Sequence, residues 1–180
     1  TSKHQFPSGV QSALAKMKEA NRMVCPILDP GVKDDPGYEV FDSGVKANIF
    51  CKTPHGSDFR GFVWPGLTVY PDFSLPEARA WWASYAAKFK KLGWAGAWLD
   101  MNDPSTGAVD PMAMRFRHGT ESHLMFRNQY ALGMQMATYD GFLEACPEER
   151  PFLISRSGYV GSSRFSAIWT GDNVSSRYYL

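Results

Sequence analysis

One short apolar run, residues 94–99, constrains the fold of this chain more than any other part of the sequence. It reads Trp-Ala-Gly-Ala-Trp-Leu and stops at Asp100. The run is too short for a helix, and its continuous apolar character is typical of a buried strand in a parallel sheet. The sequence therefore predicts a strand that presents a carboxylate at its C-terminal end.

Three further apolar runs end beside a charged side chain in the same way. They are residues 23–28, which precede Asp29, residues 151–155, which precede Arg156, and residues 166–171, which contain Trp169 and precede Asp172. An arginine at the end of a buried strand is unfavourable unless it is paired, so Arg156 is expected to bridge a carboxylate or to bind a substrate.

Helices are expected between these strands. Apolar residues recur at helical spacing after Ser8, after Ser74 and from Ser122 to Ala145, and both Ser8 and Ser74 start capping-box signatures. Residues 30–73 show no long helical period, and we expect a hairpin over residues 48–64 that turns at 54–57. The alternation predicts an α/β fold. A (β/α)₈ barrel is favoured over a doubly wound open sheet, because no Gly-rich phosphate turn follows the first strand.

The composition excludes several classes of function. Nineteen Lys and Arg balance eighteen Asp and Glu, so bulk charge recruits neither nucleic acid nor an anionic membrane, and no membrane segment is visible. The three Cys are widely spaced without a Cys-x-x-Cys pair, so we expect no disulfide framework and no zinc site. His118 and His123 lack a nearby acid at ligand spacing, so we expect loop and capping roles, no metal and no cofactor.

Two of the strand-end carboxylates are accompanied by tryptophan. Trp98 precedes Asp100, and Trp169 precedes Asp172. Aromatic faces stack on sugar rings, and pairs of carboxylates cleave glycosidic bonds, so the pattern favours carbohydrate chemistry. Trp64 lies in a Val-Trp-Pro-Gly segment, where a sugar platform and a core side chain are equally open interpretations.

Residues 98–103, Trp-Leu-Asp-Met-Asn-Asp, resemble the Trp-x-Asp-Met-Asn-Glu signature of glycoside hydrolase family 31, the α-glucosidase family. The resemblance spans nearly the whole chain, and its other motifs follow in the family's order. They are residues 28–31, 63–66, 71–73, 155–157, Arg164 and residues 169–173.

This resemblance implies a fold and a role for each site residue. The fold is part of a catalytic (β/α)₈ barrel, roughly its third to sixth strands. Asp100 would be the nucleophile and Asp172 the general acid and base, with retention of configuration at the sugar. The remaining roles concern the substrate: Asp29 and Arg156 would hold hydroxyls of the cleaved sugar, and Trp64, Trp98, Met101 and Trp169 would line its subsite.

The implied mechanism also predicts electrostatics. A retaining glycosidase needs two carboxyl groups about 5 to 5.5 Å apart. Arg156 is expected to favour the charged form of Asp100, and burial or a neighbouring charge is expected to keep Asp172 protonated.

Two departures from the family pattern bear on these expectations. Asp103 stands where the family has Glu, which affects the local loop and the neighbouring subsite. The outer barrel strands and a late histidine of the family are not in residues 1–180, which we therefore expect to be a partial catalytic barrel domain of a larger glycoside hydrolase. Unpaired strand edges predict that these residues alone would not form a stable, active enzyme.

The expected substrate is an α-glucoside or oligosaccharide cleaved at its terminal α-glucosidic linkage. An α-xylosidase is less favoured, because such members tend to carry Asp-Phe-Gly-Glu at the nucleophile. A transglucosylase of the same family and a catalytically silent glycan-binding subunit remain alternatives. The sequence gives no expectation for the cellular compartment.

Overall fold

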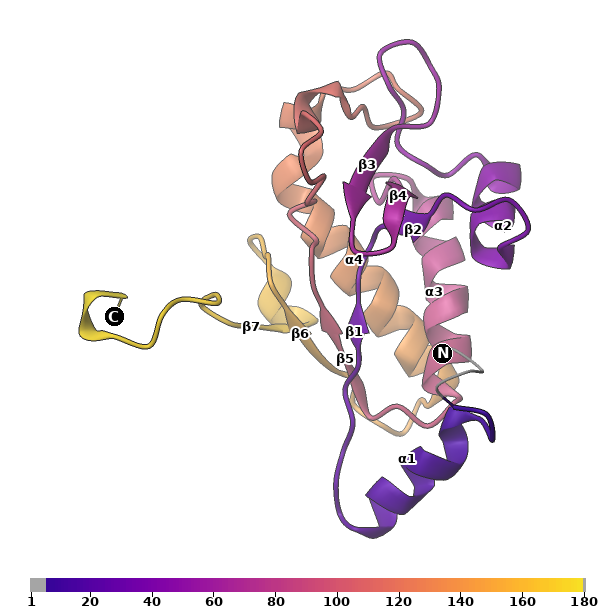
Figure 1. Cartoon of the computed structure of the whole chain (residues 1–180), viewed down its shortest axis with the longest axis vertical. Helices are drawn as coiled ribbons and strands as arrows, with labels where there is room; N and C mark the ends of the chain where they lie inside the picture. The colour runs from indigo at the N-terminus through magenta and orange to yellow at the C-terminus, as the bar shows by residue number, and fades with distance from the viewer. Residues whose placement is uncertain (1–5, 180) are drawn as a thin grey trace.

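The structure, a computed structural model, describes residues 6–179. Within these residues, four α-helices are interspersed with seven strands and three short 3₁₀ turns (Figure 1). In chain order they are α1 (Val10–Glu19), β1 (Ile27–Leu28), β2 (Val32–Lys33), α2 (Glu39–Ala47), β3 (Arg60–Val63), β4 (Gly66–Val69), α3 (Pro76–Lys90), β5 (Gly96–Leu99), η1 (Pro111–Ala113), α4 (His123–Ala145), β6 (Phe152–Ser155), η2 (Ser162–Arg164), β7 (Ala167–Ile168) and η3 (Arg177–Tyr179).

The main sheet is parallel and places its strands in the order β1-β5-β6-β7. Its register pairs Leu28 with Leu99, Leu99 with Ser155, and Ser155 with Ile168. The next residue of each strand therefore falls in one row at the C-terminal edge of the sheet. That row contains the strand-end residues that the sequence singled out: Asp29, Asp100, Arg156 and Trp169.

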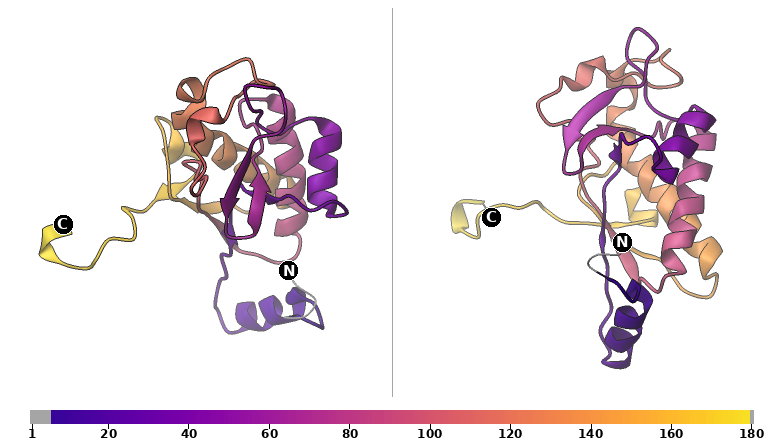
Figure 2. Two further views of the ribbon diagram at one scale, coloured as in Figure 1. Left: turned by 45° about the horizontal axis from the view of Figure 1, so that its top comes forward. Right: turned by 45° about the vertical axis from the view of Figure 1, so that its right-hand side comes forward.

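Helices α3 and α4 pack against each other and cover one face of this sheet (Figure 2). Ala97, Leu99 and Leu153 point into this core, where they meet helix side chains such as Trp82 and Met134. Because side chains alternate along a strand, the residues between them point to the opposite face. The row at the sheet edge thus shares the face of Trp98, away from the helices.

A second, antiparallel sheet in the order β2-β4-β3 lies beyond the C-terminal edge of the main sheet (Figure 1). It is attached to the loop that follows β5. The Phe62 amide donates to the Thr106 carbonyl at 3.2 Å, and the Tyr70 hydroxyl donates to the Ser105 carbonyl at 2.9 Å. This sheet therefore fixes the loop that begins at Asp100.

Several sequence expectations need correction. Residues 30–73 do contain a helix, α2. The expected turn at 54–57 is present and closes the antiparallel bridge between Lys52 and Asp58, but a second hairpin, which turns at Trp64-Pro65, joins β3 and β4. The helix caps are Gly9 and Leu75, without side-chain bonds, in place of Ser8 and Ser74. Within residues 6–179, no helix has both the length and the apolar character needed to cross a membrane.

Candidate active site

Three charged side chains meet at the C-terminal edge of the parallel sheet. Asp29 follows β1, Asp100 follows β5 and Arg156 follows β6, and the backbone amides of Asp100 and Arg156 still bond to the neighbouring strands. Regular strand pairing therefore continues up to these residues and fixes their positions. All three side chains are partly buried.

Arg156 binds two carboxylates at once. Its Nη1 lies 3.2 Å from Asp100 Oδ1, an ion pair without the alignment of a hydrogen bond. Its Nε and Nη2 donate to Oδ1 of Asp103 at 3.2 and 2.6 Å. Asp103 thus accepts two hydrogen bonds from the guanidinium, and the third nitrogen of the guanidinium, Nη1, faces Asp100.

The electrostatics of this cluster are coupled. Burial raises the pKa of the Asp29 carboxyl above its ordinary value, the negative charge of Asp100 raises it further, and the charge of Arg156 opposes both. Burial lowers the pKa of Arg156, but the hydrogen bonds and charge of Asp103, with the charges of Asp100 and Asp29, outweigh burial and raise it. Oδ1 of Asp29 is buried without a hydrogen-bond partner, so it is available to accept from a ligand.

Buried polar contacts fix the loops on both sides of this cluster. Asn102 is fully buried; its Nδ2 donates to Ser155 Oγ at 2.8 Å, and its Oδ1 accepts from the Ser157 amide at 3.1 Å. Met101 adopts a φ of 57°, which is uncommon for a side chain of its size, and its sulfur accepts from Arg156 Nη1 at 3.1 Å. The loop after β5 is therefore built around the loop after β6.

The second catalytic candidate lies in a different environment. Trp98 and Trp169 meet edge to face with ring centroids 5.5 Å apart, which links the ends of β5 and β7. Asp172 is exposed, and its Oδ1 accepts from Trp169 Nε1 at 3.3 Å. The chain leaves the sheet after β7 and extends away from the helices (Figures 1 and 2). The burial expected for Asp172 is not found.

The structure therefore brings together most, but not all, of the expected site. Asp29, Asp100, Met101 and Arg156 form one cluster, and Trp98 lies on the same face. Asp172 bonds to Trp169, which contacts Trp98, and Trp64 is 81% exposed at the β3–β4 turn. Within the described part of the chain, no three His, Cys, Asp or Glu side chains gather as metal ligands.

The strand-end cluster and its parallel sheet agree with the result of a comparison against protein families. Residues 1–180 match the family described as "Glycosyl hydrolases family 31 TIM-barrel domain". The chain belongs to glycoside hydrolase family 31. Its parallel sheet and helices are accordingly part of a (β/α)₈ barrel.

Individual family 31 proteins are similar over most of the chain. It is 37% identical over 178 residues to alpha-glucosidase 2 of Bacillus thermoamyloliquefaciens, covering 96% of the chain and 22% of that protein. It is 38% identical over 177 residues to human neutral alpha-glucosidase AB, covering 94% of the chain and 19% of that protein. A crystal structure of a glucosidase II alpha subunit is 34% identical, with a TM-score of 0.83 over 94% of the chain and 19% of that protein. The chain thus spans about a fifth of the length of these relatives.

Sequence reasoning missed Asn102 and Ser105, and it noted Asp103 only as a departure from the family pattern, without its contact with Arg156. Asp103 and Ser105 hold Arg156, and Asn102 joins the two loops. Asn102 and Asp103 stand inside the motif that drew attention to Asp100, so the motif itself was a signal for them. Ser105 gave no signal, because its contact with Arg156 depends on the path of the loop.

Proposed function

We propose that this chain supplies part of the catalytic barrel of a longer, retaining glycoside hydrolase that removes terminal α-linked glucose. The observation that carries the proposal is the row of Asp29, Asp100 and Arg156, in which a carboxylate is held beside a guanidinium at the edge of a barrel sheet. Catalytic groups of (β/α)₈ barrels lie at this edge. The similarity to proteins named alpha-glucosidases supports glucose as the sugar.

In the proposed first step, Asp100 is the nucleophile. A carboxylate oxygen of Asp100 attacks the anomeric carbon while the bond from that carbon to the leaving oxygen breaks. Asp172 donates its proton to that oxygen, and a β-linked glucosyl ester forms on Asp100.

In the second step, water replaces the leaving group. The carboxylate of Asp172 takes a proton from the water, the water oxygen attacks the anomeric carbon, and Asp100 is released. Two inversions give α-glucose, so configuration is retained. This sequence needs the Asp172 carboxyl to lie on the opposite side of the sugar from Asp100.

The other site residues bind the sugar in this proposal. Asp29 has a buried oxygen without a partner, which suits a sugar hydroxyl as donor, and the Arg156 guanidinium is fixed close by. Trp98, Met101 and Trp169 line the subsite beside Asp100. Trp64 would contribute an aromatic surface at the rim, consistent with its exposure on the β3–β4 turn.

The test uses the full-length protein that carries this chain and an aryl α-glucoside. Proton NMR during the first turnovers is expected to show α-glucose before mutarotation produces the β-anomer. Asp100→Ala is expected to abolish release, whereas Asp35→Ala, which removes a carboxylate paired with Lys33 outside the cluster, is expected to preserve it. Early release of β-glucose, or unchanged turnover in Asp100→Ala, would overturn the proposal.

A further inference from the structure

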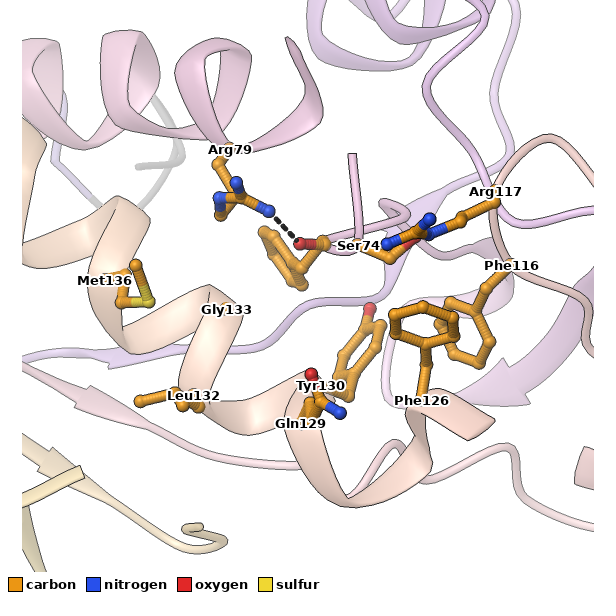
Figure 3. Close-up of a pocket in the computed structure, with 11 residues that line it drawn as sticks. Ser74, Arg79, Phe116, Arg117, Phe126, Gln129, Tyr130, Leu132, Gly133 and Met136 are labelled. Atoms are coloured by element: carbon orange, nitrogen blue, oxygen red, sulfur yellow. Dashed lines mark hydrogen bonds between the residues drawn. The ribbon is translucent and has the colours of Figure 1, made fainter. Parts of the chain in front are cut away.

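A separate cavity of about 290 Å³ lies between the start of α3, the middle of α4 and the loop at residues 116–117 (Figure 3). It shares no residue with the strand-end cluster. Its polar side chains are Arg79, Arg117, Ser74 and Gln129, and its apolar wall includes Phe126 and Met136. A hollow that combines charged groups with an aromatic wall has the character of a small-molecule site.

Two guanidinium groups border this cavity from different elements. Arg79 on α3 is anchored because its Nη1 donates to the Phe73 carbonyl at 2.7 Å. Arg117 lies over the Phe126 ring, with its guanidinium carbon 5.0 Å from the ring centroid. Each of these contacts orients one guanidinium group, and each group keeps further N–H donors that can bind a ligand.

No acid neutralises these two charges in the part of the chain that the structure describes. The residues that line the cavity include neither Asp nor Glu, and neither arginine forms an ion pair within residues 6–179. The nearby Glu77 instead lies 3.4 Å from Nε2 of His118. Two positive charges therefore face the cavity without an ion-pair partner, and the buried carboxylate of Asp72, behind the lining, accepts from the amide and hydroxyl of Ser74.

The wall of the cavity also contains a polar atom without a partner. The hydroxyl of Tyr130, whose side chain is only 2% exposed, makes no hydrogen bond. In Figure 3 it points to the side of the cavity where Ser74 and Arg117 lie. Leaving a buried hydroxyl unpaired costs about 1–3 kcal/mol.

From these features the geometry points to a binding site for the phosphate group of a small phosphate monoester. Guanidinium groups match the oxygen geometry of phosphate, and at neutral pH a monoester approaches the two negative charges that two arginines would neutralise. A carboxylate or sulfonate would leave one positive charge unpaired. The organic part of the ester would lie on the wall formed by Phe126, Leu132 and Met136.

The test is isothermal titration of the full-length protein with phenyl phosphate, inorganic phosphate and benzenesulfonate. Phenyl phosphate is expected to bind more tightly than inorganic phosphate, because only the ester reaches the apolar wall. Benzenesulfonate has the same ring but one negative charge, and we expect its affinity to be weaker by roughly tenfold or more, the worth of one charged hydrogen bond. Equal affinity for the ester and inorganic phosphate would overturn the assignment to a monoester.

Matched variants locate the site. Arg117→Gln and Arg79→Gln each remove one charge and keep a donor, so the bond to Phe73 can persist in the second variant. Each is expected to weaken phenyl phosphate binding by roughly tenfold or more. Arg127→Gln removes the same charge from α4, outside the cavity, and is expected to leave affinity unchanged. Equal losses in all three variants, or no binding to the unmodified protein, would overturn the proposal, and neither outcome depends on glucoside turnover.

Discussion

The two catalytic candidates stand in contrasting surroundings. Asp100 follows a four-residue strand that is paired on both sides, and Arg156 lies 3.2 Å from its carboxylate. Asp172 lies beyond a two-residue strand, is exposed, and accepts a hydrogen bond from the indole of Trp169 at 3.3 Å. One carboxylate is held by the sheet, and the other by a single aromatic side chain.

This difference corresponds to different chemical demands. A nucleophile must stay close beneath the anomeric carbon, which favours a fixed position beside a positive charge. A group that first donates and later accepts a proton must serve two steps. The contrast therefore predicts that the two aspartates can be told apart by chemistry as well as by position.

The largest expected effect is the fall in turnover when either carboxylate is removed. Adding azide as an external nucleophile then shows which role each carboxylate had. Asp100→Ala is expected to lower turnover on the order of 10⁴-fold or more, and Asp172→Ala about 10²- to 10⁴-fold. On a dinitrophenyl α-glucoside, whose leaving group needs no proton, the first step survives in Asp172→Ala. Azide then attacks the glucosyl ester and gives the α-glucosyl azide. In Asp100→Ala, azide attacks the substrate directly and gives the β-azide.

NMR of the isolated azides distinguishes the two roles. Trp64→Ala retains both carboxylates and serves as the control, in which no azide product is expected to accumulate beyond that of the unmodified protein. The same anomer from both aspartate variants would remove the distinction between the two residues.

The long elements of the fold were predictable from the sequence because local pattern and burial agree there. The periodic apolar residues of α3 and α4 and the apolar runs of β5 and β6 all gave the correct element. Helix α2 was missed, because Gly44 interrupts its pattern. A Cβ on Gly44 would stand 2.3 Å from Cζ of Phe50. Glycine is therefore required here by tertiary packing, which the local sequence pattern does not show.

The next largest effect concerns how Arg156 is held beside Asp100. Asp103→Asn removes the charge that binds Nε and Nη2 of Arg156, and kcat/KM is expected to fall roughly 10- to 100-fold, the worth of a charged hydrogen bond. Asp103→Glu restores the charge and the residue usual in the family, and should recover most of the loss. Ser105→Ala removes a weaker contact with Arg156, and a smaller loss of roughly two- to tenfold is expected.

Steady-state kinetics on an aryl α-glucoside measure these variants. A general loss of structure would affect Asp103→Asn and Asp103→Glu alike, whereas a positioning role predicts recovery in the second. Failure of Asp103→Glu to recover activity would show that charge at this position does not position Arg156.

The site was predictable only where sheet geometry alone decides position. The C-terminal ends of parallel strands lie at the same edge of a sheet, so the sequence alone was enough to group Asp29, Asp100 and Arg156. The side chains that orient Arg156 could not be identified in this way. They come from the irregular loop after β5, whose path depends on the Tyr70 bond to the Ser105 carbonyl and on buried Asn102. The position of Asp172 likewise depends on a contact between two tryptophans on strands that are not neighbours.

The smallest expected effect is a shift of the pH profile of kcat/KM when Asp29, the neighbour of Asp100, is replaced. Burial and the charge of Asp100 raise the pKa of Asp29, and Arg156 opposes them only in part. If ionised Asp29 binds the sugar, kcat/KM falls as the pH drops through this raised pKa. Asp29→Asn cannot titrate, and it also removes a negative neighbour from Asp100. The acidic limb of the kcat/KM profile of Asp29→Asn should therefore lie at lower pH than that of the unmodified protein, and its maximal kcat/KM should be lower.

Values of kcat/KM between about pH 4 and pH 7 test this. Asp35→Asn is the control, and its acidic limb is expected to coincide with that of the unmodified protein. Superimposable acidic limbs for Asp29→Asn and the unmodified protein would show that Asp29 does not contribute to this titration, and the coupling between the strand ends would then rest on Asp100 and Arg156 alone.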